Sequence, residues 1–268
     1  MVSHPCAMTI PESESLSPKT ARMSPIRFAV GVVFTVLYWP TVAIILIIMS
    51  LSTGLVMNPI ARRRLGQDTI ALMLGIFISG LEWLDAIRVD DAELAQCAEM
   101  PGPLIIACNH PALWDAPLVL RRIGRVFCVM KADVAANPLL RGGTRFAGYI
   151  PNSPRLQMIR EAVARLNSGG RLLLFPEGTR TRYEQGPVNP FRPGLALMAK
   201  KSGAPVLPIF ISTNSPYLGK GWPIWKMAEL PISISIRVGK PLQIRPEERL
   251  RDFSERLEKY FRTELERK

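Results

Sequence analysis

The chain has 268 residues, a formal net charge of +12, a mean hydropathy of +0.14 and 48% hydrophobic residues. The length allows one domain with a full core, or one domain and an appendage. The charge indicates an anionic partner: nucleic acid, an acidic membrane surface, or acidic substrates and carrier proteins. Aromatic residues make up only 7% of the chain and the basic residues are dispersed, which argues against nucleic acid.

The residues that most often form metal sites and disulfides are few and scattered. Cys6, Cys97, Cys108 and Cys128 form no C-x-x-C pair. We therefore expect reduced, mostly buried cysteines in a cytoplasmic compartment, with neither a metal nor a disulfide. Residues 1–25, rich in Ser, Pro and Thr, predict a mobile tail, and His4 within it is not expected to take part in chemistry.

An apolar segment follows the tail. Residues 28–61 include no charged side chain, and basic residues bracket them on both sides, Arg27 before and Arg62 to Arg64 after. The run exceeds the about 20 residues of a spanning helix, and Pro40 predicts a kink or a break into two helices. A second apolar segment, residues 69–81, is short for a span. We expect residues 26–85 to form membrane-anchoring helices.

Three arrangements of these helices remain open: a hairpin within one leaflet, a single span, and simple core helices. The hairpin is favoured because basic residues flank both ends of the first apolar run, which suits the anionic cytoplasmic leaflet. A cleaved signal peptide is disfavoured, because the run is too long and ends without a small-residue cleavage site. We therefore expect the cytoplasmic face of a membrane, the bacterial inner membrane, as the location of the protein.

From about Ala86 the pattern changes to short apolar runs that alternate with amphipathic segments. Continuous apolar runs predict strands covered on both faces at residues 103–108, 125–130, 171–176, 205–211 and 232–238. Helical patterns occupy residues 137–148, 155–167 and 246–268. This alternation predicts an α/β fold with a largely parallel central sheet flanked by helices.

The sequence HPALWD, His110 to Asp115, follows the first of these strands. His110 should therefore stand at the carboxyl end of a strand, where α/β sheets place their sites. A helix would separate positions 110 and 115 by ~140°, but in a turn that enters a helix Asp115 can reach the imidazole. Such a carboxylate fixes the tautomer of a general base. The alternative is a histidine in a core turn, with Asp115 as a helix cap.

The sequence FPEGTR, residues 175–180, follows another predicted strand. Proline and glycine around Glu177 predict a tight turn with exposed backbone N–H groups, and Arg180 offers a bidentate donor for phosphate or carboxylate. The alternative is an ordinary exit from a strand. Two such motifs at the ends of neighbouring predicted strands favour a functional site over coincidence.

Together the motifs resemble the PlsC-like 1-acylglycerol-3-phosphate O-acyltransferases, a glycerolipid acyltransferase family. HPALWD matches its His-x4-Asp motif, FPEGTR its Phe-Pro-Glu-Gly-Thr-Arg motif, and APVLPIFI its Val/Ala-Pro segment, in order from residue 103 to residue 241. The resemblance implies an acyltransferase domain over residues 86–268. It also implies that an acyl chain passes from acyl-CoA or acyl carrier protein, as donor substrates and without a cofactor, to 1-acyl-sn-glycerol-3-phosphate, giving phosphatidic acid.

The resemblance also assigns roles to individual residues. It makes His110 the general base and Asp115 its orienting partner. It makes Lys131, Arg155, Glu177, Gly178, Thr179 and Arg180 substrate-binding residues. The family also has a motif in which five residues separate a glycine from an arginine. This chain departs from it, because six residues separate Gly148 from Arg155. Another lysolipid acceptor, a lysophospholipid or an amino-acid lysolipid, therefore stays open.

Three other kinds of function are less consistent with the sequence. A lipid hydrolase would need a nucleophile, and the chain contains no G-x-S-x-G elbow. A nonenzymatic membrane-binding protein on the same scaffold would not need His110, Asp115 and Glu177. Kinase or phosphatase chemistry is disfavoured by the absence of a P-loop motif.

Overall fold

The structure is a computed structural model, and it describes residues 24–267 except positions 55, 224, 225 and 227. The tail expected over residues 1–25, including His4, therefore lies outside the described residues except for its last two positions. Cys6 also lies outside the described residues. The other three cysteines, Cys97, Cys108 and Cys128, are free and buried. The burial expected for these three cysteines is confirmed.

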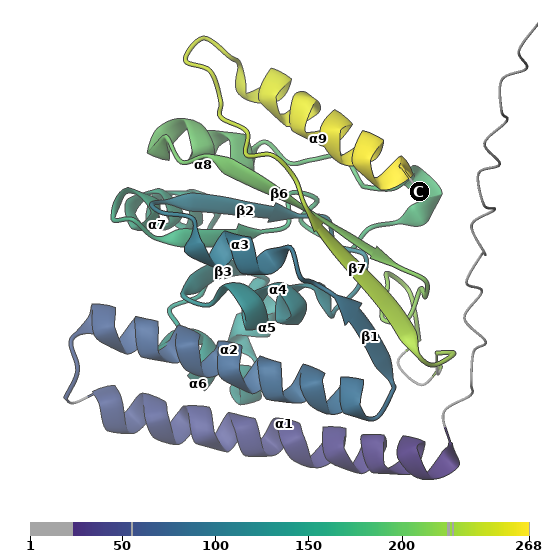
Figure 1. Ribbon diagram of the computed structural model, residues 1–268. Helices are drawn as coiled ribbons and strands as arrows, with labels where there is room; N and C mark the ends of the chain where they lie inside the picture. The colour runs from purple at the N-terminus through teal and green to yellow at the C-terminus, as the bar shows by residue number, and fades with distance from the viewer. Residues whose placement is uncertain (1–23, 55, 224–225, 227, 268) are drawn as a thin grey trace, which may run out of the picture.

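A seven-stranded sheet forms the centre of the molecule, in the order β1-β7-β6-β2-β5-β3-β4 (Figure 1). The strands are β1 (Ile87–Asp90), β2 (Leu104–Cys108), β3 (Val126–Met130), β4 (Ile150–Pro151), β5 (Arg171–Leu174), β6 (Val206–Thr213) and β7 (Ile232–Val238). Neighbouring strands pair in parallel, except for the antiparallel pair β6 and β7. The predicted largely parallel sheet and its five predicted strands are confirmed.

Helices cover both faces of this sheet, as predicted (Figure 1). The helices of the described residues are α1 (Pro25–Gly54), α2 (Pro59–Trp83), α3 (Leu94–Glu99), α4 (Asp115–Ile123), α5 (Ala132–Ala136), α6 (Pro138–Phe146), α7 (Arg155–Asn167), α8 (Gly194–Ser202) and α9 (Leu250–Glu266), with a 3-10 turn at Tyr183–Gln185. The three predicted helical segments correspond to α6, α7 and α9. The strands β1 and β4 were not predicted, because four and two residues carry too little pattern.

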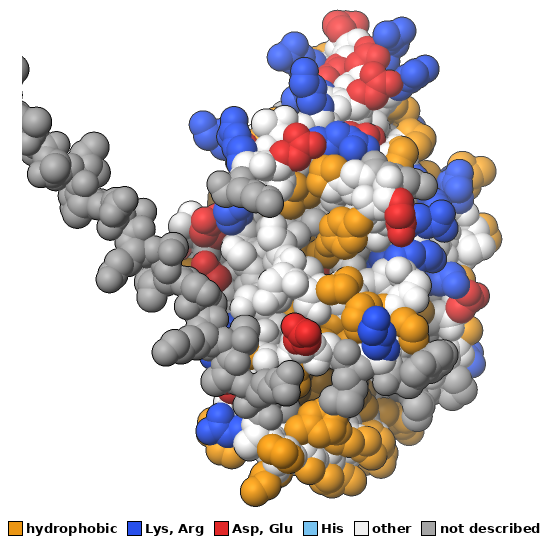
Figure 2. All heavy atoms as spheres, turned by 90° about the vertical axis from the view of Figure 1, so that its right-hand side faces the viewer, with side chains coloured by type: hydrophobic (Ala, Val, Ile, Leu, Met, Phe, Trp, Pro, Cys, Tyr) orange, Lys and Arg blue, Asp and Glu red, His pale blue; other side chains and the backbone are white. Residues whose placement is uncertain are grey.

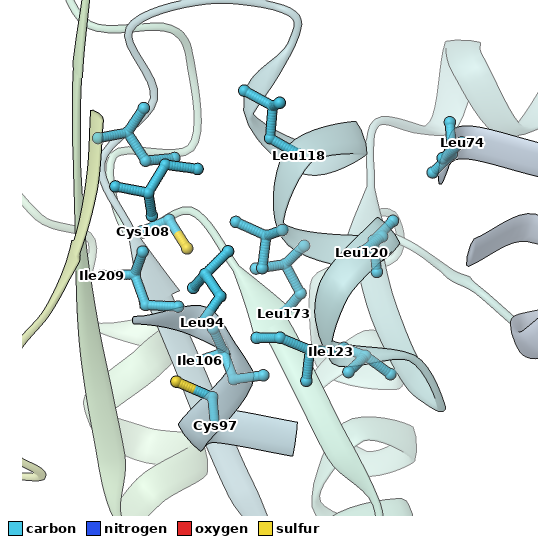
Figure 3. Close-up of a cluster of buried hydrophobic side chains, with 14 of the residues drawn as sticks. Leu74, Leu94, Cys97, Ile106, Cys108, Leu118, Leu120, Ile123, Leu173 and Ile209 are labelled. Carbon is cyan, nitrogen blue, oxygen red and sulfur yellow. The ribbon is translucent and has the colours of Figure 1, made fainter. Parts of the chain in front are cut away.

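Two buried apolar clusters hold the helices on the sheet. One lies between the sheet and α2, α3 and α4, and includes Ile78, Leu94, Ile106 and Leu118 (Figure 3). The other lies between the opposite face and α7, α8 and α9, and includes Phe253. Because side chains of a strand alternate between faces, Ile105 and Ile106 of β2 belong to different clusters. This explains the continuous apolar runs that predicted these strands.

The first two helices form an antiparallel hairpin (Figure 1). Of the kink or break expected at Pro40, the break into two helices is wrong, because α1 continues through this residue to Gly54. Tyr38 and Trp39 pack on Phe77 of α2, and Val42 beyond the proline is buried, so contacts on both sides stabilise the helix. The turn of the hairpin falls instead before α2, where the Asn58 side chain accepts a 2.9 Å hydrogen bond from the Ala61 N–H.

Both hairpin helices are long and apolar enough to cross a membrane, but they differ in burial. In the most apolar part of α1 only 11% of residues are buried, and its exposed side chains include Val36, Leu37 and Leu51. Helix α2 buries one face on α4 and belongs to the main core. Hydrophobic side chains gather at the foot of the molecule, over this hairpin (Figure 2). The exposed face of α1 indicates membrane association.

Candidate active site

His110 and Asp115 contact each other at the carboxyl end of β2. The Nδ1 atom of His110 lies 2.6 Å from Oδ2 of Asp115, and the same oxygen accepts a 2.9 Å hydrogen bond from the Ala112 N–H. Pro111 follows the strand, and Asp115 is the first residue of α4, so the short turn directs the carboxylate back to the ring. The carboxylate therefore orients the imidazole and is not the N-cap of α4, a position held by Trp114.

The imidazole is fixed on a second side. The Phe175 ring stacks on it with a centroid distance of 4.1 Å and an interplanar angle of 20°. An ionised Asp115 accepts the hydrogen of Nδ1, which leaves the lone pair on Nε2. The His110 side chain is 19% exposed, whereas that of Asp115 is 2% exposed. The arrangement thus offers one proton-accepting nitrogen to a substrate.

Glu177 connects three segments around this pair. Its Oε1 atom accepts hydrogen bonds from the His110 N–H at 2.8 Å and from the Thr181 hydroxyl at 2.9 Å, and Oε2 accepts one from the Asn189 N–H at 2.9 Å. The residue is 2% exposed. Both oxygens thus face protein donors, so this carboxylate fixes the backbone at His110 relative to β5 and the loop after it.

Burial shifts the pKa of both buried carboxyl groups, Asp115 and Glu177. It raises the pKa of Asp115 above its ordinary value, while the hydrogen bonds from His110 and Ala112 and the positive charge of Arg180 oppose this shift. Burial likewise raises the pKa of Glu177, opposed by its three hydrogen bonds. Each carboxylate therefore depends on its hydrogen-bond donors to remain ionised.

The FPEGTR segment forms the predicted tight turn. Gly178 has a φ of +67°, and a Cβ there would lie 2.5 Å from Nε of Arg192. Only glycine accommodates both this backbone conformation and the close approach of the arginine. Thr179, next in the turn, is partly exposed. The Arg192 N–H donates to the Pro176 carbonyl, so Arg192 covers the turn.

Arg180 points toward the segment before β7. Its Nη1 atom donates to the carbonyls of Leu218 at 2.7 Å and Gly219 at 2.8 Å. The Leu113 N–H also donates to the Leu218 carbonyl, so this segment holds both motifs. Arg180 therefore positions the segment before β7, and its contact with substrate stays a prediction.

Lys131 directly follows β3, which neighbours β5, and Arg155 begins α7 after β4, the edge strand beyond β3. Both are exposed, and Nζ of Lys131 lies 2.6 Å from Oδ2 of Asp133. The side-chain oxygen of Asn152 accepts from the Ala132 N–H, which joins the two segments. Among the described residues no hydrogen bond or ion pair links Lys131 or Arg155 to His110, Asp115 or Glu177. Lys131 and Arg155 share with His110 the carboxyl edge of the sheet, and a common substrate contact stays a prediction.

Three residues of the site were not predicted from the sequence. Thr181 and Asn189 bind Glu177, and the Asn109 side chain bridges β2 to β6 through the N–H and C=O of Ile211 at 2.7 and 2.8 Å. Thr181 and Asn109 each adjoin one of the two motifs, and this position in the sequence could have identified them. Asn189 lies twelve residues beyond Glu177, and no motif marks it.

Apolar side chains are exposed on the segments that follow these strands. Leu113 after β2 is 53% exposed, Leu156 after β4 is 70% exposed, and Tyr183 after β5 is 54% exposed. This edge of the sheet therefore combines a histidine, exposed cations and apolar groups, which are the features that a charged amphiphile requires.

Comparisons with known proteins find similarity to acyltransferases. A family model described as Acyltransferase matches residues 86–212. The chain is 24% identical over 139 residues to a chloroplastic 1-acyl-sn-glycerol-3-phosphate acyltransferase of Brassica napus, covering 50% of this chain and 40% of that protein. It is 31% identical over 131 residues to a lyso-ornithine lipid O-acyltransferase of Pseudomonas aeruginosa, covering 44% and 49%. The alignments thus span less than half the length of these relatives.

A crystal structure of the PlsC acyltransferase from Thermotoga maritima superimposes with a TM-score of 0.63 and 21% identity, covering 90% of this chain and 96% of that one. This match includes the hairpin as well as the sheet, and it shows that the two chains share a fold. Residues 86–212, which contain the His110–Asp115 pair and the Glu177 turn, match the Acyltransferase family model.

Proposed function

We propose that this protein transfers an acyl chain from a thioester donor to the hydroxyl of a lysolipid, with His110 as general base. The observation that carries the proposal is the contact between Nδ1 of His110 and the buried carboxylate of Asp115 at the carboxyl edge of the sheet. This contact leaves Nε2 to accept the hydroxyl proton. The family domain and the names of the relatives support the same chemistry.

The chemical steps need only groups that this chain and its substrates supply. Nε2 of His110 takes the hydroxyl proton while the hydroxyl oxygen attacks the thioester carbonyl. The tetrahedral intermediate collapses, the carbon–sulfur bond breaks, and the imidazolium returns the proton to the leaving thiolate. Asp115 stabilises the imidazolium between these steps, and Glu177 keeps the backbone of His110 in place. A thioester is already activated, so the proposal includes no metal and no cofactor.

The acceptor that we propose is 1-acyl-sn-glycerol-3-phosphate, whose acylation gives phosphatidic acid. Lys131 and Arg155 offer exposed positive charge for its phosphate, and Leu113 and Leu156 offer apolar contacts for its chain at the same edge. Arginine binds phosphate oxygens with two parallel N–H donors. The Brassica relative named for this acceptor supports the choice.

A lyso-ornithine lipid is the second candidate acceptor. The observation that favours it is the 31% identity to the Pseudomonas enzyme named for that lipid. The loop before Arg155 also has one residue more than the family pattern, which shifts the arginine along the edge. An acceptor that carries an ornithine carboxylate in place of a phosphate would still suit a cationic edge.

The donor is acyl-CoA or an acyl carrier protein, both polyanionic, and the net charge of +12 suits either. We place the protein on the cytoplasmic face of a membrane, the bacterial inner membrane, because cytoplasmic thioesters must reach the site. The exposed apolar face of α1 would enter the lipid there.

An acceptor panel tests the proposal. Purified full-length protein in vesicles would receive 1-acyl-sn-glycerol-3-phosphate, a zwitterionic lysophospholipid or a lyso-ornithine lipid, each with radiolabelled acyl-CoA and acyl carrier protein. We expect label in phosphatidic acid and loss of this label in the His110→Ala variant. Label only in the ornithine lipid would select the second acceptor. Free fatty acid as the sole product, or no thioester consumption, would contradict acyl transfer.

A further inference from the structure

A cavity of about 730 Å³ lies at the turn end of the hairpin, away from the residues of the candidate active site. Its walls come from three helices: Ile47, Ser50 and Leu51 from α1, Arg62 from α2, and Arg141 and Arg145 from α6. In Figure 1 the hairpin turn and α6 lie at the lower left. None of the residues assigned to acyl transfer lines it.

The charge of this cavity is positive and uncompensated. Three of its lining residues are arginines and none is acidic. Among the described residues, Arg62, Arg141 and Arg145 take part in no ion pair. Arg141 and Arg145 stand four positions apart on α6, so their like charges face the same side of the helix, which destabilises a helix without a counter-ion. An anion in the cavity would neutralise this repulsion.

Arg62 is held on the cavity wall by a residue of α1. Its Nη2 atom donates to the carbonyl and the hydroxyl of Ser50, both at 3.0 Å, which fixes the guanidinium on the cavity wall. Its Nε atom is buried and has no hydrogen-bond partner in the structure. Because this Nε atom is buried, a ligand in the cavity does not reach it, and an anion would instead meet the positive charge of the three guanidinium groups that form no ion pair within the described part of the chain.

The apolar wall indicates what kind of anion fits. Ile47 and Leu51 are 38% and 71% exposed and belong to the exposed apolar face of α1. Arg62 lies near the start of α2, directly after the uncharged stretch of residues 28–61, so it flanks the apolar hairpin as basic residues flank apolar segments at a membrane surface. An anion with attached acyl chains could place its charge between the arginines and its chains along α1. A free anion would gain nothing from the apolar wall.

We propose that Arg62, Arg141 and Arg145 bind the phosphodiester headgroup of an anionic bilayer phospholipid. The site is separate from the catalytic edge and does not require acyl transfer. Its bound lipid holds the turn of the hairpin in an anionic leaflet and bridges α2 to α6. Arginine forks supply the headgroup contacts, and Ile47 and Leu51 supply the contacts to the acyl chain.

The test uses full-length protein in neutral detergent and dihexanoyl phosphatidylglycerol as the soluble probe, with binding measured by calorimetry. No thioester is added, so the measurement does not depend on the proposed acyl transfer. Dihexanoyl phosphatidylcholine and inorganic phosphate are the comparison ligands. We expect saturable binding of dihexanoyl phosphatidylglycerol and much weaker binding of both comparison ligands. Equal binding of phosphatidylcholine, or of inorganic phosphate, would overturn the proposal.

Variants locate the binding. Because α6 exposes both side chains, Arg141→Gln with Arg145→Gln should fold and should weaken binding about 30-fold, at about fivefold for each charge. Arg62→Gln should also weaken it. The matched control is Arg64→Gln with Arg160→Gln, two exposed arginines outside the cavity, which should bind as the unaltered protein does. Equal loss in the control, or no loss in the cavity variants, would refute the site.

A further variant excludes the catalytic edge as the source of the signal. Lys131→Gln with Arg155→Gln alters the candidate acceptor residues and should leave binding of dihexanoyl phosphatidylglycerol unchanged. If this variant abolishes binding, the probe occupies the acceptor site and the proposed headgroup site is refuted.

Discussion

The Nδ1 atom of His110 lies 2.6 Å from Oδ2 of Asp115, and the Ala112 N–H donates to the same oxygen. One carboxylate therefore fixes both the ring and the turn that carries it. His110 and Asp115 are five positions apart in the sequence, directly after a strand. Their contact leaves one nitrogen of the histidine available as a base.

Replacing Asp115 with Asn should slow acyl transfer while leaving the fold intact. The amide cannot stabilise the imidazolium as a carboxylate does, and it can favour the wrong tautomer. We expect kcat to fall by about 10²–10⁴-fold, the range for general acid–base catalysis. Asp252→Asn, which alters a carboxylate on the exposed surface of α9, is the control. Unchanged kcat in Asp115→Asn would reduce Asp115 to a structural residue of the turn.

The pH dependence of stability should differ between two buried carboxyl groups. Burial raises the pKa of Asp115 above 3.8, so its contribution to stability is full below pH 3.8 and is lost as the pH rises through the raised value. The Asp115→Asn variant has no carboxyl group to ionise at this position, so it does not lose this contribution to stability as the pH rises. Its free energy of unfolding, relative to the unaltered protein, should therefore increase as the pH rises from 3.8 toward neutrality.

Asp91 should show the opposite behaviour. Burial opposes its ionisation, but hydrogen bonds from Arg122 and Arg121 hold its pKa below 3.8. Its contribution is present above pH 3.8 and is lost as the pH falls through the lower value. Asp91→Asn should cost roughly 3–5 kcal/mol near neutrality, the range for breaking a buried ion pair. Denaturant unfolding in detergent at several pH values measures both variants, and parallel pH profiles would contradict these assignments.

Glu177→Ala should lower kcat more than it raises either KM. The substitution leaves the His110 N–H, the Thr181 hydroxyl and the Asn189 N–H without their acceptor, so the histidine loses its fixed position. We expect a loss of about 10²-fold, as for misplacement of a catalytic group. Glu177→Gln keeps one acceptor oxygen and should recover part of the activity. Glu184→Gln, in the exposed 3-10 turn, is the control. A change confined to the acceptor KM would instead indicate direct contact with substrate.

Arg155→Gln should weaken use of 1-acyl-sn-glycerol-3-phosphate without altering use of the thioester. A hydrogen bond to a charged group contributes about 1.5–3 kcal/mol, so kcat/KM for the acceptor should fall by roughly 10- to 150-fold. Arg160→Gln, also exposed on α7, is the matched control. If only the donor kinetics change, Arg155 belongs to the donor site. If neither changes, the longer loop holds it away from the phosphate.

Much of this arrangement could be predicted from the sequence, because short-range patterns determined it. The apolar runs of β2 and β5 marked buried strands, and the motifs after them marked the carboxyl edge of the sheet. Contacts that depend on strand order could not be predicted this way. Asn189 reaches Glu177 only because its loop folds back, and Arg262 of α9 donates to the neighbouring Val188 carbonyl. Pro40 misled the prediction, because packing against α2 outweighed its tendency to break a helix.

The most direct test of the central claim is the rate of acyl transfer by His110→Ala, measured with labelled thioester and saturating lysolipid in vesicles. Circular dichroism and vesicle flotation would establish that the variant folds and binds membranes as the unaltered protein does. Removal of the base should lower kcat by about 10²–10⁴-fold. A folded, membrane-bound His110→Ala variant with kcat within about threefold of the unaltered protein, far short of that range, would contradict the account.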